Sequence, residues 1–212
     1  MLLGLVSSVQ PVGAQSKMVT HWLTVSVHPA VYPKVHPNEV EDILKGASDL
    51  LQGKHTDITP PNNCQVEFKF KRFIPWTSGP ADITDDTDLE QVQEVPADVK
   101  VVQNITYCAP GNGEYAGCAW RPKSGQRTVI VARSQFSPSI GNGPVIWAHE
   151  YGHTTGLIHR NEADSENLMS PCVLQVFNVK IDQSECGKFR AGPVSKYPPT
   201  LGPGCPAGHP ND

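Results

Sequence analysis

The sequence predicts an α+β fold, on the evidence of three features. Its first half alternates stretches of strand periodicity with one stretch of helical periodicity. A second helical stretch follows at Pro144–Thr155. Beyond it the chain is mostly irregular and ends in a segment rich in proline and glycine, Pro193–Asp212. This order favours a sheet-bearing lobe above a cleft, with a looser lobe below it.

The first two elements are a strand and a helix. Within His21–His28 apolar residues recur at every second position, which is the strand pattern. Asn38 is expected to be the N-cap of the following helix, with Glu41 as its capping-box partner. Gly53 is expected to end that helix. Its apolar face would consist of Val40, Ile43, Leu44, Ala47, Leu50 and Leu51.

Three more strands are predicted upstream of the second helix. Gln65–Phe73 alternates apolar and polar residues, and Val99–Ile105 and Thr128–Ala132 are apolar runs. After that helix, Asp182–Arg190 is expected to form a short helix, because its acidic start and basic end match the helix dipole.

One string within the second helix predicts a metal site. Residues 149–159 follow the pattern H-E-x-x-H-x-x-G-x-x-H. His149 and His153 lie one turn apart on one helix face, so both can reach the same ion. Gly156 tolerates a positive φ, which lets the chain bend and bring back His159 as a third ligand. Three nitrogen ligands with an open fourth position are typical of catalytic zinc. The alternative is an ordinary helix with histidines on its polar face.

This long motif resembles that of the metzincins, a clan of zinc metalloendopeptidases. Met169, within Asn167–Pro171, resembles the methionine of the Met-turn, which lies beneath the three zinc-binding imidazoles in that clan. Two departures prevent assignment to a family within the clan. Pro171 stands where some families have a zinc-reaching tyrosine, and Arg160 follows the third histidine in place of serine, aspartate or glutamate.

The resemblance implies one catalytic zinc ion, bound by His149, His153 and His159. Zinc lowers the pKa of a water from about 15.7 to about 7. Glu150, beside the first ligand, would act as general base and later protonate the leaving amine.

The resemblance also implies a two-lobed catalytic domain, divided at about residues 20–156 and 157–212. It has a twisted, mixed five-stranded sheet with a backing helix, an active-site helix and an irregular C-terminal lobe. One edge strand of that sheet is antiparallel. Thr128–Ala132 or its neighbour would border the cleft, where a peptide adds as an extra strand.

Residues 1–16 resemble the remnant of a secretory signal peptide, and residues 17–212 would then form a single domain. The alternative for this start is a disordered terminus or a first strand. Six cysteines, none in a C-x-x-C pair, suit three disulfides in an oxidising compartment. A secreted, extracellular protein is expected, with the bacterial periplasm as an alternative. Our preferred pairing is Cys108–Cys118, Cys172–Cys186 and Cys64–Cys205.

Charge and hydropathy exclude several partners. With a net charge of −4 the chain has no basic field for nucleic acid, and no apolar run approaches a membrane span. A monomer is expected, with a protein or peptide substrate as its partner. The acidic segment Asp82–Asp88 offers carboxylates for calcium, but it lacks the EF-hand pattern, and a solvated loop is favoured.

The sequence therefore predicts a secreted zinc endopeptidase. Two other classes remain open. One is a catalytically inactive, zinc-containing module that binds peptides, and the other is a disulfide-stapled structural protein without metal. The intact Glu150 favours the enzyme, because an inactive descendant is free to lose its general base.

Overall fold

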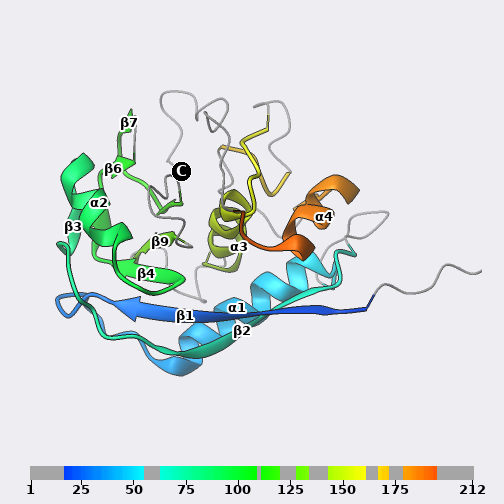
Figure 1. The fold of residues 1–212 in the computed structure, drawn as a ribbon, viewed down its shortest axis with the longest axis horizontal. Coiled ribbons are helices and arrows are strands. Elements are labelled where there is room, and N and C mark those ends of the chain that lie inside the picture. The colour runs from blue at the N-terminus through cyan, green and yellow to red at the C-terminus, as the bar shows by residue number, and fades with distance from the viewer. Residues whose placement is uncertain are drawn as a thin grey trace, which may run out of the picture.

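The structure, a computed structural model, combines a five-stranded sheet with helices on both of its faces (Figure 1). It describes residues 17–54, 63–108, 111–119, 128–133, 143–160, 167–171 and 179–194. The predicted signal remnant, residues 1–16, lies outside these residues, as does the tail from residue 195 onward. The prediction of an α+β fold with a mixed five-stranded sheet is confirmed.

The strands of this sheet follow the order β2-β1-β4-β9-β8. Their bounds are Val19–Val27 for β1, Val66–Phe73 for β2, Val99–Val102 for β4, Gly117–Cys118 for β8 and Val129–Ala132 for β9. The first four strands in that order pair in parallel, and β8 pairs with β9 antiparallel at the edge. Parallel neighbours need a crossover, which helix α1 (Pro37–Leu51) supplies between β1 and β2.

Helices cover both faces of the sheet. Because adjacent strand residues point to opposite faces, Val101 and Val102 of β4 belong to different apolar clusters. Val101 lies in the larger cluster with α1 and α3 (Gly143–Thr154), and Val102 lies with α2 (Asp86–Gln93). Every residue of β4 is buried, as expected for a parallel strand covered on both sides.

Helix α1 begins earlier than the sequence predicted. Its N-cap is His36 instead of Asn38, and the carboxylate of Glu39 accepts a 2.9 Å hydrogen bond from the His36 N–H. The capping partner is therefore not Glu41. Pro37 explains the shift, because its fixed φ and missing N–H suit the first helical position.

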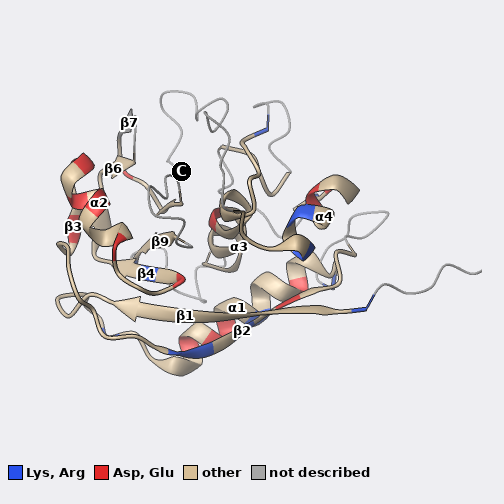
Figure 2. Ribbon diagram, in the orientation of Figure 1, with Lys and Arg blue, Asp and Glu red and all other residues tan. Residues whose placement is uncertain are grey.

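The acidic segment Asp82–Asp88 is not the solvated loop that its composition favoured. It contains β3 (Asp82–Ile83) and the start of α2. Asp85 caps α2 by accepting from the N–H of Asp88 at 2.9 Å, and Asp88 accepts from the N–H and hydroxyl of Thr84 at 2.9 and 2.6 Å. Figure 2 shows the acidic residues gathered on α2. Calcium binding, the less favoured alternative, stays untested, but protein donors already engage three of these carboxylates, because Asn104 also donates to Asp82 at 2.6 Å.

The strand predicted at Val99–Ile105 is divided at Gln103. The N–H of Gln103 donates to the Ala81 carbonyl at 2.6 Å, and its side-chain oxygen accepts from the Tyr32 N–H at 2.9 Å. These bonds redirect the chain, so β5 (Asn104–Ile105) pairs with β3 outside the main sheet. Two further short strands, β6 (Tyr107–Cys108) and β7 (Gly111–Asn112), form a hairpin.

Disulfides join Cys108 to Cys118 and Cys64 to Cys186. The first pairing was predicted and is confirmed. The predicted pairs Cys172–Cys186 and Cys64–Cys205 are wrong, because helix α4 (Gln183–Ala191) docks beside the residues that lead into β2. Cys64 and Cys186 lie 122 residues apart in sequence, but their Cα atoms are 4.7 Å apart. Cys172 and Cys205 lie outside the described residues.

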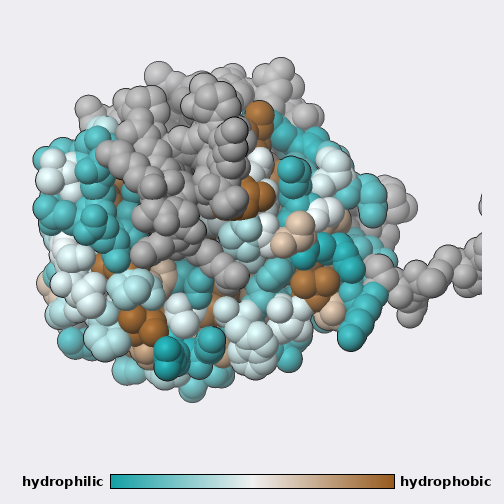
Figure 3. All heavy atoms as spheres, in the orientation of Figure 1, coloured by the Kyte–Doolittle hydropathy of each residue, from teal (hydrophilic) through white to brown (hydrophobic). Residues whose placement is uncertain are grey.

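The described surface is largely hydrophilic on the face shown in Figure 3, with small, separate hydrophobic patches. Among the helices of the described residues, none has the length and apolar content needed to cross a membrane.

Candidate metal site

The end of α3 positions the histidine motif. Gly156 has φ +83°, and its N–H donates to the His153 carbonyl at 2.9 Å. The N–H of Leu157 donates to the Gly152 carbonyl at 3.2 Å. Together these two bonds form a Schellman motif, which closes the helix and reverses the chain. The predicted bend at Gly156 is therefore present, and it carries His159 back toward the helix.

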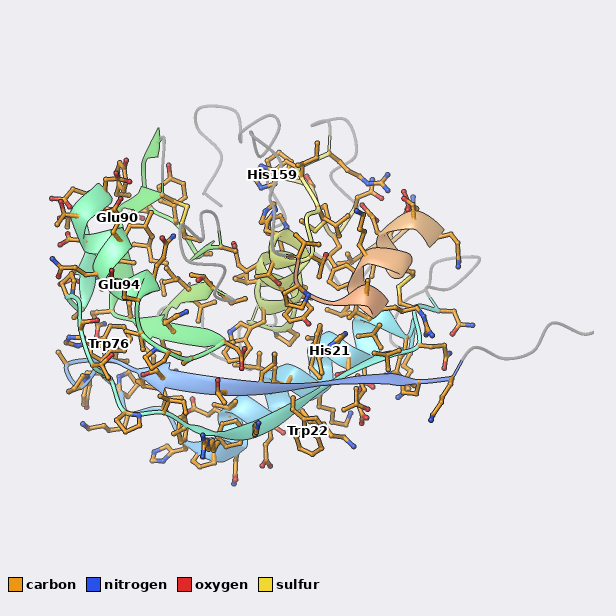
Figure 4. All side chains as sticks on the ribbon, viewed as in Figure 1. His21, Trp22, Trp76, Glu90, Glu94 and His159 are labelled. Atoms are coloured by element: carbon orange, nitrogen blue, oxygen red, sulfur yellow. A yellow bond between two sulfur atoms is a disulfide. The ribbon has the colours of Figure 1, made fainter. Side chains whose placement is uncertain are left out.

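The three histidines converge on one point. The Nε2 atom of His153 lies 3.1 Å from Nε2 of His149 and 3.1 Å from Nε2 of His159. The ligand atoms of all three residues lie within 4.8 Å of one another. His149 and His153 are buried in α3, and His159 is partly buried. His159 lies beyond the end of that helix (Figure 4). This group can hold a metal ion.

Backbone carbonyls determine which ring nitrogens face that point. Nδ1 of His149 lies 2.6 Å from the Leu168 carbonyl oxygen, and Nδ1 of His153 lies 2.9 Å from that of Leu157. A carbonyl only accepts hydrogen bonds, so Nδ1 of each ring carries the proton and Nε2 carries a lone pair. Two lone pairs facing each other at 3.1 Å repel unless a cation lies between them.

The two distances from His153, and the protonation of His149 and His153, are compatible with a bound metal ion. Tetrahedral ligands at Zn–N distances of about 2.0–2.1 Å would have nitrogens about 3.3 Å apart. Burial, aided by the charge of His159, lowers the pKa of His149 to about 3. Burial, with the charges of the other two rings, also lowers the pKa of His153 well below its usual value. Both rings are therefore neutral at pH 7, as metal ligands must be.

Met169 is completely buried against α3. A Cβ atom on Gly152 would come within 2.6 Å of the Met169 sulfur, so only glycine leaves room for this methionine next to His153. The carbonyl of Met169 accepts a 2.7 Å hydrogen bond from the N–H of Arg160, the residue after His159. The structure thus places Met169 against α3 and next to the backbone that follows His159, and its position beneath the three imidazoles stays a prediction.

Glu150 is buried against the edge of the sheet. Its carboxylate lies over Gly117 of β8, where a Cβ atom would come within 2.5 Å of Oε1. The side chain is only 5% exposed, and its neighbour His149 belongs to the metal-binding group. The motif identified Glu150, but nothing in the sequence distinguished Gly117 from the other glycines of its loop.

Two groups of residues around the site were not predicted from the sequence. The carbonyls of Leu157 and Leu168 orient the rings, but any residue type can supply a backbone carbonyl, so the sequence does not reveal this contact. Arg160 was noted only as a departure, whereas its side chain binds Glu185 and Asp182 at the start of α4. In the sequence, Asp182 and Glu185 have the spacing of a capping box, which indicates the start of a helix. That spacing does not reveal that the same two acids bind Arg160.

Comparisons with known proteins add little to this geometry. No family model matches the chain, and no curated protein matches it. One solved chain, described as "Structure of a chaperone-substrate complex", is similar at 14% identity with a TM-score of 0.47. The match covers 82% of this chain and 34% of that chain, so this chain spans about a third of its length.

Proposed function

We propose that this chain is a secreted, zinc-dependent endopeptidase of the metzincin type. The observation that carries the proposal is the convergence of three imidazoles, in which Nε2 of His153 lies 3.1 Å from Nε2 of each of the other two, next in sequence to the buried Glu150. Neither feature alone would suffice, because a metal-binding histidine cluster can be purely structural.

Zinc is the metal that best fits these donors. Neutral imidazoles suit zinc among the common biological cations, whereas calcium and magnesium prefer oxygen ligands. A zinc ion held by His149, His153 and His159 supplies a Lewis acid that acidifies water and polarises a carbonyl. The hydrogen bonds from Nδ1 to the Leu157 and Leu168 carbonyls would orient two of the rings and raise their basicity.

Glu150 is suited to proton transfer. As general base it accepts a proton from the attacking water, and it then passes that proton to the amine that leaves. Its side chain is buried, and its carboxylate lies over the edge strand β8. This position supports its assignment as the base.

Strand β8 is the proposed site of substrate docking. It is the last strand on its side of the five-stranded order and runs antiparallel to β9. A sheet edge offers main-chain donors and acceptors with which an extended peptide pairs. A peptide on β8 would pass the carboxylate of Glu150, which supports hydrolysis of internal peptide bonds in preference to terminal ones.

The disulfides support a location outside the reducing cytosol. Cys64–Cys186 and Cys108–Cys118 would persist in the extracellular space or in a bacterial periplasm. Secretion is therefore part of the proposal.

The test is digestion of a broad peptide library by the zinc-loaded chain, with and without chelator, and with Glu150→Gln as control. The enzyme proposal expects internal cleavages that both the chelator and the substitution abolish. Stoichiometric zinc without cleavage would favour the inactive peptide-binding module. A chain that retains no zinc would favour the structural class.

A further inference from the structure

The third histidine is held differently from the other two. His149 and His153 stand on α3, whose helical geometry fixes their spacing. His159 instead lies in an irregular stretch, three residues past the bend at Gly156. A ligand on irregular backbone needs other contacts to hold it in place, because loops are less rigid than helices.

Arg160, the next residue, makes such contacts with α4. Its Nε donates to Oε1 of Glu185 at 2.7 Å, and its terminal nitrogen forms an ion pair with Asp182. The Glu185 side chain is only 5% exposed, so this pair is largely removed from water. Loss of the arginine would leave a buried carboxylate without its cation, which is costly.

The two carboxylates are themselves held rigidly by the helix start. Asp182 accepts hydrogen bonds from the N–H groups of Ser184 and Glu185 at 2.8 and 2.9 Å. Glu185 returns a bond by accepting from the N–H of Asp182 at 2.9 Å. This capping box holds both acids in place relative to α4 by contacts that do not involve Arg160.

Helix α4 is in turn anchored to the sheet. Cys186, adjacent to Glu185, is joined to Cys64 just before β2, and Phe189 is completely buried. At its far end Arg190 donates to the carbonyls of Cys64 and Gln65 at 3.3 and 3.2 Å. The acids that receive Arg160 therefore stand on a rigid support.

We propose that Arg160 is a positioning residue for the third metal ligand, acting through its ion pairs with Glu185 and Asp182. A second tie, from the Arg160 N–H to the Met169 carbonyl, holds the same backbone at 2.7 Å. Together they set where His159 meets the other two rings. This inference rests on the metal site of the proposed function.

The test measures zinc affinity of the full chain by competition with a chromophoric chelator. Arg160→Met keeps the aliphatic stem but removes both ion pairs, and it is expected to weaken zinc binding by about 10–100-fold. Arg160→Lys keeps the positive charge but cannot contact Glu185 and Asp182 through two separate nitrogens as the guanidinium does. Its zinc affinity should therefore lie between those of wild type and Arg160→Met. Glu185→Gln should also weaken binding, because it removes the charge of the buried acceptor.

The matched control is Arg190→Ala, which removes an arginine at the far end of α4, while the Cys64–Cys186 disulfide and buried Phe189 still hold the acids that bind Arg160. It should lower the thermal midpoint of the metal-free chain while retaining wild-type zinc affinity. The visible spectrum of the cobalt-substituted protein supplies a readout of ligand geometry. That spectrum should change in Arg160→Met and stay unchanged in Arg190→Ala.

Two results would overturn the inference. One is wild-type zinc affinity and an unchanged cobalt spectrum in Arg160→Met. The other is equal loss of affinity in Arg160→Met and Arg190→Ala, which would indicate general loosening. If Arg160→Met does not fold, the same measurements of zinc affinity and of the cobalt spectrum are made on Glu185→Gln and Arg160→Lys. Zinc binding by wild type without peptide cleavage would contradict the peptidase proposal alone, since affinity still reports on Arg160.

Discussion

The carboxylate of Glu150 lies so close to Gly117 that a Cβ atom on the glycine would come within 2.5 Å of Oε1 and 2.7 Å of Cδ. The two residues come from α3 and from the edge strand β8. The absence of a side chain at Gly117 is therefore what lets the proposed general base lie at the edge where a substrate would bind.

Gly117→Ala is expected to displace the Glu150 carboxylate and reduce kcat/KM for peptide cleavage by about 10²-fold, with zinc retained. Loss of a general base lowers the rate by about 10²–10⁴-fold. A base that is displaced but still present is expected to cause a loss at the lower end of this range. Gly113→Ala is the control, because its nearest neighbour, the ring of Tyr115, lies at an ordinary 3.6 Å. Full activity in Gly117→Ala would contradict the role of this contact.

Gly152→Ala is expected to destabilise the fold by about 1–3 kcal/mol, because its methyl group would overlap the Met169 sulfur at 2.6 Å and crowd Phe189 at 3.1 Å. Gly187→Ala in α4 meets no atom within 4 Å and should instead stabilise by about 0.5–1 kcal/mol through helix propensity. Urea unfolding of both variants checks the pair. Equal changes in the free energy of unfolding would show that helix propensity, and not the contact with Met169, determines the effect of Gly152→Ala.

The metal-free chain should lose stability as the pH falls from about 6.5 toward 5. In the folded state burial lowers the pKa of His149 to about 3, so only the unfolded chain takes up this proton in that range. Lys100, whose pKa burial lowers to about 7, has its main effect at higher pH. The free energy of unfolding measured at each pH in the presence of chelator checks this prediction.

His149→Gln supplies the control for the pH experiment. It removes the titrating ring, so its free energy of unfolding should fall less steeply between pH 6.5 and 5 than that of wild type. Parallel curves for the two proteins would contradict the assignment.

Removal of the Cys64–Cys186 disulfide should destabilise more than removal of Cys108–Cys118. The two bridges close loops with sequence separations of 122 and 10 residues, and the longer loop gains more entropy in the unfolded state. A loss of about 4–5 kcal/mol is expected for the Cys64→Ala/Cys186→Ala variant. Denaturant midpoints of the two double variants test the ranking, and peptide mapping of wild type tests the pairing.

The sequence predicted the parts of the site that lie within eleven consecutive residues. Helical periodicity fixes the separation of His149 and His153, and Gly156 marks the bend that returns His159. Strand periodicity likewise located β1 and β2, because alternation directly reflects burial of one face. These inferences depended on local spacing alone.

Contacts between distant segments were not predictable in this way. The pairing of Cys64 with Cys186 depends on where α4 docks, and the contact of Gly117 with Glu150 depends on the order of strands in the sheet. Helix α2 was missed because it buries only two apolar side chains, Leu89 and Val92, within a segment dominated by acids.

The most direct test of the central claim is the anomalous diffraction of zinc-loaded crystals, which locates the ion. We expect one zinc within about 2.0–2.1 Å of Nε2 of His149, His153 and His159, with the Glu150 carboxylate nearby but not a ligand. Zinc found elsewhere, or bound by fewer than these three rings, would contradict it.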